Sequence, residues 1–338
     1  MKLATTTDDF CEYITDSRAL SYTLDCFRET PFRHFDLSFC AVTYPGSVWY
    51  ESGDDWKREA EDCAKKAEAY GFDFVQAHAP FLPDTDYFDP DKRPAYMRAI
   101  HHSIEACAML GIPHITLHGV FLYGDTQDKF IQQNLLFCRE LGETAEKCGV
   151  DILIENFQDS DFGYYFRRGL EMRQFIEYAD IPRLHACWDT GHANIGEGFD
   201  QYHDLLELGS HLRALHIQDN WGTSDAHVMP MVGIINYDQI IKALIEIGYK
   251  GFFSFEAPDT LRVGGDSHHK RRNLLPDDKL ANPTIFLQQK MTTVKYEIGK
   301  WMLESYGVFG NKNLTDRTET PIVLLSVFRL FPQNLFVN

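Results

Sequence analysis

Four short apolar segments between residues 151 and 256 each lead into a residue that can bind a metal ion. They read DILIENF, LHACWDTGHAN, LRALHIQDN and FFSFEAP. Apolar runs of this length are typical of strands that are buried on both faces of a parallel sheet. In chain order they place four side chains at or just beyond a strand end, namely Glu155, Asp189, His216 and Glu256. In a closed barrel of such strands the C-terminal ends share one face, where these four side chains would converge.

The rest of the chain alternates between strand-like and helix-like segments. Further strands are expected at 2–6 and 33–39, in FDFVQAHAP with its end at His78, and in IPHITLHG with its end at His118. Helices are expected at 11–29, 54–70, 92–110, 128–148, 169–179, 199–209, 237–248 and 284–305. Three of these helices should stop at a glycine, namely Gly71, Gly111 or Gly149. This alternation predicts an α/β protein in which residues 1–305 form one (β/α)8 TIM-barrel domain.

Two segments depart from this alternation. Residues 259–283 are polar and hold the only dense basic cluster, at 268–272. They are expected to form either a long loop or lid over the barrel mouth or a disordered insertion. Residues 306–338 form a C-terminal extension that ends in an apolar run broken by Arg329 and Pro332. This run is too short and too interrupted to span a bilayer, and we assign it no role.

The composition argues against several classes of function. The chain has 338 residues and a net charge of -18, whereas general nucleic-acid binding needs clustered Lys and Arg. Its eight cysteines include no CxxC pair, which favours reduced thiols in a cytoplasmic protein. The N-terminus lacks the apolar core of a secretory signal, and no apolar stretch approaches 20 residues. We expect no nucleic-acid partner and no membrane association.

The strand-end residues suggest a particular metal chemistry. Three carboxylates and one imidazole suit Mn²⁺, Mg²⁺ or Co²⁺ better than a structural zinc ion. Four histidines are candidates for substrate contacts or for further metal ligands, namely His78, His118, His192 and His227. Weaker candidates are Asp225, the possible ligand-orienting Asn156 and Asn194, and the loop aromatics Trp49, Phe81 and Trp221, for which ordinary packing is favoured. We interpret His101, His102, His203 and His211 as structural.

Short motifs around these residues resemble the xylose-isomerase-like TIM barrels. They are HAP at 78–80, LHG at 117–119, IEN at 154–156, DTGHAN at 189–194, LHIQDN at 215–220, DAH at 225–227 and FEA at 255–257. The superfamily includes sugar-phosphate isomerases and epimerases, keto-sugar 3-epimerases and AP endonucleases of the endonuclease IV type. The resemblance covers residues 1–256 and the last helix. It implies that Glu155, Asp189, His216 and Glu256 hold one divalent metal, and that Glu155 and Glu256 are an acid/base pair.

The first function that follows is a metal-dependent sugar isomerase or epimerase. Moving a proton next to a carbonyl requires a base on one face, an acid on the other and a cation that stabilises the enediolate. Glu155 and Glu256 come from strands well apart in the barrel and could face each other across a sugar. We expect Mn²⁺ first, with Mg²⁺, Co²⁺ or Zn²⁺ as alternatives. The resemblance also implies a homo-oligomer.

Three alternatives remain open at this point. The chain matches all nine ligand positions of the three-zinc AP endonucleases, a phosphodiesterase chemistry that its charge of -18 disfavours. A metal-dependent lyase on an oxidised sugar, such as the catalytic subunit of a C-glycoside deglycosidase, would use the same proton abstraction. In that case 259–283 and the tail could serve a partner subunit. A non-enzymatic sugar-binding protein is disfavoured because both glutamates are present.

Overall fold

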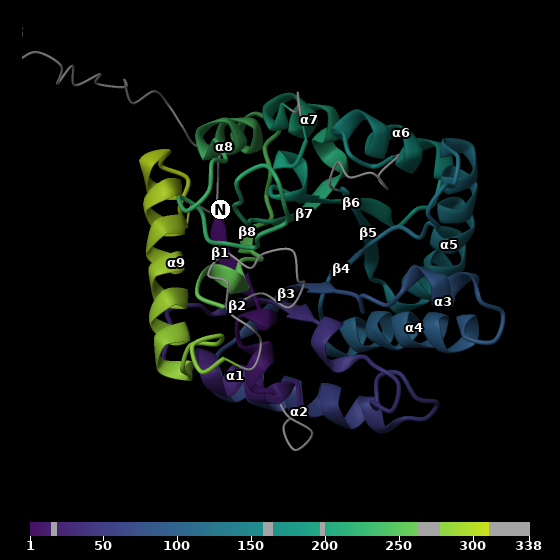
Figure 1. Ribbon diagram of the computed structural model, residues 1–338, viewed down its shortest axis with the longest axis horizontal. Coiled ribbons are helices and arrows are strands. Elements are labelled where there is room, and N and C mark those ends of the chain that lie inside the picture. The colour runs from purple at the N-terminus through teal and green to yellow at the C-terminus, as the bar shows by residue number, and fades with distance from the viewer. Residues whose placement is uncertain (15–18, 158–164, 197–199, 263–277, 311–338) are drawn as a thin grey trace, which may run out of the picture.

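Eight parallel strands form a barrel in the computed structural model, which describes residues 1–14, 19–157, 165–196, 200–262 and 278–310 (Figure 1). The strands are β1 Lys2–Thr6, β2 His34–Ser38, β3 Asp73–His78, β4 His114–Leu117, β5 Asp151–Glu155, β6 Leu184–Asp189, β7 Leu212–His216 and β8 Phe252–Phe255. Neighbours pair in the order β7-β6-β5-β4-β3-β2-β1-β8. Backbone bonds close the circle just beyond the last two strands, because Ile217 N donates to Ser254 O at 2.8 Å and Glu256 N to Ile217 O at 3.0 Å. The predicted TIM barrel is confirmed.

Helices surround the barrel on its outer side (Figure 1). They are α1 Ser21–Phe27, α2 Asp55–Tyr70, α3 Asp84–Phe88, α4 Arg93–Leu110, α5 Gln127–Cys148, α6 Gly169–Ala179, α7 Gln201–Leu208, α8 Tyr237–Glu246 and α9 Ile285–Ser305. The three predicted helix stops are correct, since Gly71, Gly111 and Gly149 take left-handed φ angles of 65°, 69° and 71°. Within the described ranges, none of the helices combines the length and apolarity that crossing a membrane would require.

The expected helix at 11–29 is confirmed only for residues 21–27, and residues 15–18 lie outside the described part of the chain. The described part of this segment holds a 3-10 turn, Thr7–Tyr13, and a seven-residue helix, α1. Thr6 accepts a hydrogen bond from Asp8 N at 3.1 Å and so starts the turn directly after β1. The Asp9 carboxylate then binds Lys295 of α9. Local apolar spacing therefore predicted an α-helix across residues 11–13, where the chain forms the end of a 3-10 turn.

Two other predicted segments differ from the structure in detail, and two more lie largely outside the described residues. The loop between Pro80 and the helix at 92–110 contains the short helix α3, and β4 ends at Leu117, one residue before His118. Of the segment 259–283, only 259–262 and 278–283 are described, so the basic cluster at 268–272 lies outside the described residues. Residues 311–338 of the C-terminal extension also lie outside them.

Apolar rings pack on the outside of the sheet, and polar side chains lie inside the barrel. Aromatic rings fill the layer between sheet and helices, as where Phe35 packs on Phe27 and Phe72 with ring centroids 4.6 and 4.9 Å away. Inside the barrel, Gln76 on β3 donates to Asp36 on β2 at 2.7 Å and to the Leu215 carbonyl on β7 at 3.3 Å. Buried polar side chains thus form the floor beneath the strand ends. All eight cysteines are in the reduced thiol form.

Candidate metal centre

The ends of four consecutive strands bring the predicted metal ligands together. Glu155 closes β5, Asp189 closes β6, His216 closes β7 and Glu256 follows β8 by one residue. Each offers one ligand atom, and the four atoms all lie within 4.8 Å of one another. The first three residues are at most 1% exposed, while the Glu256 side chain is 13% exposed. The buried side of the cluster is therefore fixed by the barrel, and Glu256 is its more accessible member.

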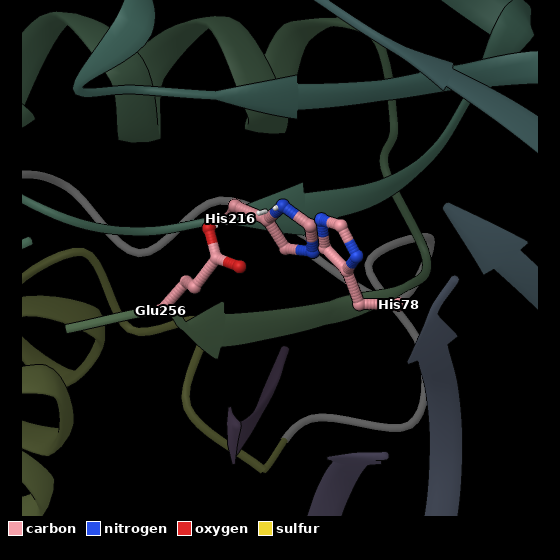
Figure 2. A group of neighbouring side chains, drawn as sticks. All are labelled: His78, His216 and Glu256. Atoms are coloured by element: carbon pink, nitrogen blue, oxygen red, sulfur yellow. Dashed lines mark ion pairs between the residues drawn. The ribbon is translucent and has the colours of Figure 1, made fainter. Parts of the chain in front are cut away.

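Glu155 lies at the centre of the group. Its Oε1 is 2.5 Å from His216 Nδ1, and its Oε2 is 3.1 Å from His118 Nε2 and 3.5 Å from His78 Nε2. Glu256 Oε2 approaches the same His216 Nδ1 at 3.4 Å (Figure 2). The two glutamates therefore converge on one imidazole nitrogen from strands that β6 and β7 separate.

Asp189 is oriented by its neighbours on both sides. Asn156, the residue after β5, donates to the Asp189 carbonyl at 2.9 Å and accepts from the Asp189 amide at 2.6 Å. The Asp189 carboxylate accepts the His192 amide at 2.6 Å and lies 3.3 Å from Gln218 Nε2. Asn156 therefore holds the backbone of this residue as expected. Asn194 instead donates to Asn220 Oδ1 at 2.9 Å and does not contact a predicted ligand.

A second group of potential ligands lies beside the first. Asp225 Oδ2 is 3.1 Å from His192 Nε2 and 2.9 Å from His227 Nε2. The other ring nitrogen of each histidine bonds a carbonyl of the first group's segments, His192 to Asn156 O and His227 to Glu256 O, both at 2.9 Å. These three residues could hold a second cation. The structure thus brings Asp225, His192 and His227 into one site, as the sequence suggested.

His78 and His118 complete the arrangement on the side of β3 and β4. The ring of His78 stacks on that of His216, with centroids 5.4 Å apart and planes at 16° (Figure 2). Its Nδ1 bonds the Ala79 carbonyl at 2.7 Å and lies 3.3 Å from Cys40 Sγ. The exposed ring of Phe81 packs edge-on against His118 at 5.1 Å. The Nε2 atoms of His78 and His118 therefore point toward Glu155, inside the mouth of the barrel.

The surroundings of Glu155 and Glu256 shift the pKa values of the two carboxyl groups in opposite directions. Burial alone would raise the pKa of Glu155, but the charge of His216 and hydrogen bonds from His118 and His216 hold it well below its usual range. Burial raises the pKa of Glu256 to about 7, against the opposing charge of His216. Burial would lower the pKa of His192, yet Asp189 and Asp225 raise it to about 10. Protonated histidines therefore balance a dense set of carboxylates, a task that a bound cation can take over.

The donor set fits a divalent metal ion. Metal–oxygen and metal–nitrogen bonds of about 2.0–2.2 Å place ligand atoms no more than about 4.4 Å apart. The observed 4.8 Å limit among the four atoms requires only small side-chain movements to reach this spacing. Three carboxylates with one imidazole favour Mn²⁺, Mg²⁺ or Co²⁺ over a structural zinc ion. Glu155, Asp189, His216 and Glu256 would hold this ion.

The remaining candidate residues include packing residues, exposed aromatics in loops and a histidine away from the site. Trp49 is buried, donates to Glu59 Oε2 at 2.5 Å and packs near Trp56, on which His102 stacks at 4.9 Å. Both Trp49 and His102 are therefore packing residues, as expected. Phe81 and Trp221 are 61% and 40% exposed in loops that follow strands. His203 bonds the adjacent helix cap Asp200 at 2.7 Å, away from the candidate ligands.

Three polar residues of the site were not found by sequence reasoning. Asp36 and Gln76 lie within β2 and β3, where HFDLS and DFVQAH look like ordinary strands. Gln218 links the two groups, since its Nε2 donates to Asp225 Oδ1 at 2.5 Å and its Oε1 accepts from the His227 amide at 3.0 Å. For Asp36 and Gln76, the available signal was a charged or amide side chain inside an otherwise apolar strand. Gln218 was visible within LHIQDN but carried no distinguishing pattern.

Comparison with known proteins agrees with this geometry. The model of a family described as xylose isomerase-like TIM barrel matches residues 36–275. A ketose 3-epimerase from Arthrobacter globiformis is 32% identical over 164 residues, which are 46% of this chain and 53% of the relative. A probable endonuclease 4 from Acholeplasma laidlawii is 22% identical over 210 residues, which are 57% and 70% of the two chains. The chain thus spans about half to two thirds of the length of such curated relatives.

Solved structures support the fold. D-psicose 3-epimerase from Clostridium cellulolyticum H10, solved with D-tagatose, superimposes with a TM-score of 0.68 at 18% identity. The match covers 90% of this chain and 99% of that one. Identity at this level is informative about the barrel architecture alone.

Proposed function

The chain belongs to the xylose isomerase-like TIM-barrel family, and on this premise we propose that it is a metal-dependent sugar isomerase or epimerase. The observation that carries the proposal is the convergence of Glu155 and Glu256 on His216 Nδ1, at 2.5 and 3.4 Å, within a set of four metal-binding side chains. The similarity to a ketose 3-epimerase supports a sugar as the substrate.

Glu155 and Glu256 would exchange the proton. Two carboxyl groups whose environments push their pKa values apart are the pattern expected of an acid/base pair. In the metal-free protein the two pKa values lie apart, with that of Glu155 well below its usual range and that of Glu256 at about 7, and a bound cation would favour the ionised form of both carboxylates. A divalent metal, with Mn²⁺ the first choice, would supply charge stabilisation for the enediolate oxygens.

The surrounding histidines would bind and orient the sugar. His78 and His118 point their Nε2 atoms into the mouth beside Glu155, and Phe81 covers His118. His192 and His227 border the other side and are fixed by backbone carbonyls. Neutral or charged imidazoles can bond sugar hydroxyls at these positions. A cytoplasmic location is part of the proposal and is supported by the reduced state of the eight cysteines.

Solvent deuterium exchange tests the proton transfer. The purified protein with Mn²⁺ would be incubated in D₂O with phosphorylated and unphosphorylated ketohexoses, and exchange next to the carbonyl followed by NMR. Glu155→Gln and Glu256→Gln should each slow exchange by about 100- to 10,000-fold. Trp301→Gln, on the exposed outer face of α9, is the matched control and should exchange at the wild-type rate. Full exchange by both glutamine variants would refute the acid/base assignment.

A three-metal phosphodiesterase is the second candidate. It is favoured by the second ligand group, His192, Asp225 and His227, and by the similarity to a probable endonuclease 4. Closely spaced zinc ions would activate water and neutralise a phosphate. Cleavage of an abasic-site DNA duplex by the zinc-loaded protein, without deuterium exchange into ketohexoses, would favour this candidate over the epimerase.

A further inference from the structure

We propose that Asp36 is a positioning residue that acts on the metal through His216. This inference rests on the proposed metal site but not on which reaction the site performs. Asp36 lies in the middle of β2, which β1 and β8 separate from β7 on the shorter way round the closed barrel, and its Oδ2 is 3.0 Å from His216 Nε2. Both side chains are at most 1% exposed. The contact therefore crosses the barrel interior beneath the strand ends.

The two ring nitrogens of His216 have different surroundings. Nδ1 faces the glutamates, with Glu155 at 2.5 Å and Glu256 at 3.4 Å. Nε2 faces away from the metal-binding atoms and toward Asp36. A hydrogen bond from Nε2–H to a carboxylate fixes the tautomer in which Nδ1 is free to bind a metal. It also holds the ring plane and makes Nδ1 a stronger donor to the ion.

Asp36 is itself held for this contact. Gln76 Nε2 donates to the same Oδ2 at 2.7 Å and is anchored on the Leu215 carbonyl, one residue before His216. Among the described residues, the other carboxylate oxygen, Oδ1, has no hydrogen-bond partner. A buried carboxylate with an unsatisfied oxygen lowers stability. The barrel tolerates this cost at a position where the second oxygen supports a metal ligand.

Mn²⁺ affinity tests the role without any substrate. Protein freed of metal by a chelator would be titrated with Mn²⁺, with the free ion followed by electron paramagnetic resonance. Asp36→Asn keeps the shape but removes the charge, and it should weaken Mn²⁺ binding by about 10- to 100-fold. Asp204→Asn is the matched control, since Asp204 is also buried but bonds Arg168 and the Gly169 amide outside the site. Its Mn²⁺ affinity should equal that of the wild type.

Thermal unfolding of the metal-free proteins separates positioning from a structural role. Asp36→Asn should unfold within a few degrees of the wild type, whereas added Mn²⁺ should stabilise it less. Gln76→Met, which removes the amide that orients Asp36, should weaken Mn²⁺ binding in the same direction and keeps the inference testable if Asp36→Asn does not fold. Unchanged Mn²⁺ affinity in either folded variant would overturn the inference.

The outcome is distinguishable from a failure of the proposed function. Weakened Mn²⁺ binding in a protein that exchanges no deuterium into any ketohexose would support the role of Asp36 and refute the epimerase. Unchanged Mn²⁺ binding by His216→Ala would overturn the role of Asp36, because the ring on which it acts would then not hold the metal.

Discussion

Breaking the buried ion pair between Asp9 and Lys295 should be among the most destabilising single changes in the barrel. Lys295 Nζ lies 2.6 and 2.7 Å from the two Asp9 carboxylate oxygens, and the side chains are 3% and 0% exposed. Thr5 and Thr292 donate to Asp9 Oδ2 at 3.1 and 3.3 Å. The pair thus ties α9 to the turn that follows β1, next to the barrel mouth.

Lys295→Met removes one partner and leaves the Asp9 charge buried. Breaking a buried pair in this way costs about 3–5 kcal/mol of unfolding free energy. The double variant Asp9→Asn with Lys295→Met should recover part of this loss. The neutral amide oxygen of the asparagine can still accept hydrogen bonds from the Thr5 and Thr292 hydroxyls, and no unpaired charge is left buried. Urea unfolding followed by circular dichroism would measure the cycle. A loss below about 1 kcal/mol, the range of exposed pairs, would show that the pair is not desolvated and would refute the reasoning.

Two further predictions concern the site. Burial raises the pKa of Glu256 from 4.5 to about 7, so the stability it contributes is complete below its unfolded pKa and is lost as pH rises through about 7. The melting temperature of the metal-free wild type should therefore fall relative to that of Glu256→Gln between pH 5 and pH 8. If the melting temperatures of the two proteins change in parallel with pH, the raised pKa of Glu256 is contradicted. In Gly191→Ala, the added Cβ would lie 2.2 Å from Gln218 Cδ and displace the amide beside Asp189 and Asp225. Mn²⁺ affinity should fall while circular dichroism stays unchanged, and an unaltered affinity would argue against this steric account.

The sequence was informative about the barrel because its signals are local. Each apolar run ends at a polar residue, and glycines such as Gly71 and Gly111 stop helices through a left-handed φ that other residues adopt with strain. Parallel strands in a closed barrel share one carboxyl edge, so the sequence alone predicts that Glu155, Asp189 and His216 lie together.

Contacts across the barrel could not be predicted in the same way. Asp36 alternates with apolar neighbours in HFDLS, and only closure of the barrel shows that it faces His216 from β2. The expected helix at 11–29 was too long for a similar reason, because the 3-10 turn Thr7–Tyr13 and the partner of its Asp9, Lys295, leave no signal in local apolar spacing. Side-chain partners far apart in the chain carry no local periodicity.

Metal content tests the central claim most directly. The protein would be purified without chelator, and elemental mass spectrometry would count metal ions per chain in the wild type and in His216→Ala. About one Mn²⁺, Mg²⁺ or Co²⁺ per chain, lost in His216→Ala, is the result expected from the cluster of Glu155, Asp189, His216 and Glu256. Two or three zinc ions per chain, or metal content that does not depend on His216, would contradict a single-metal proton-transfer site.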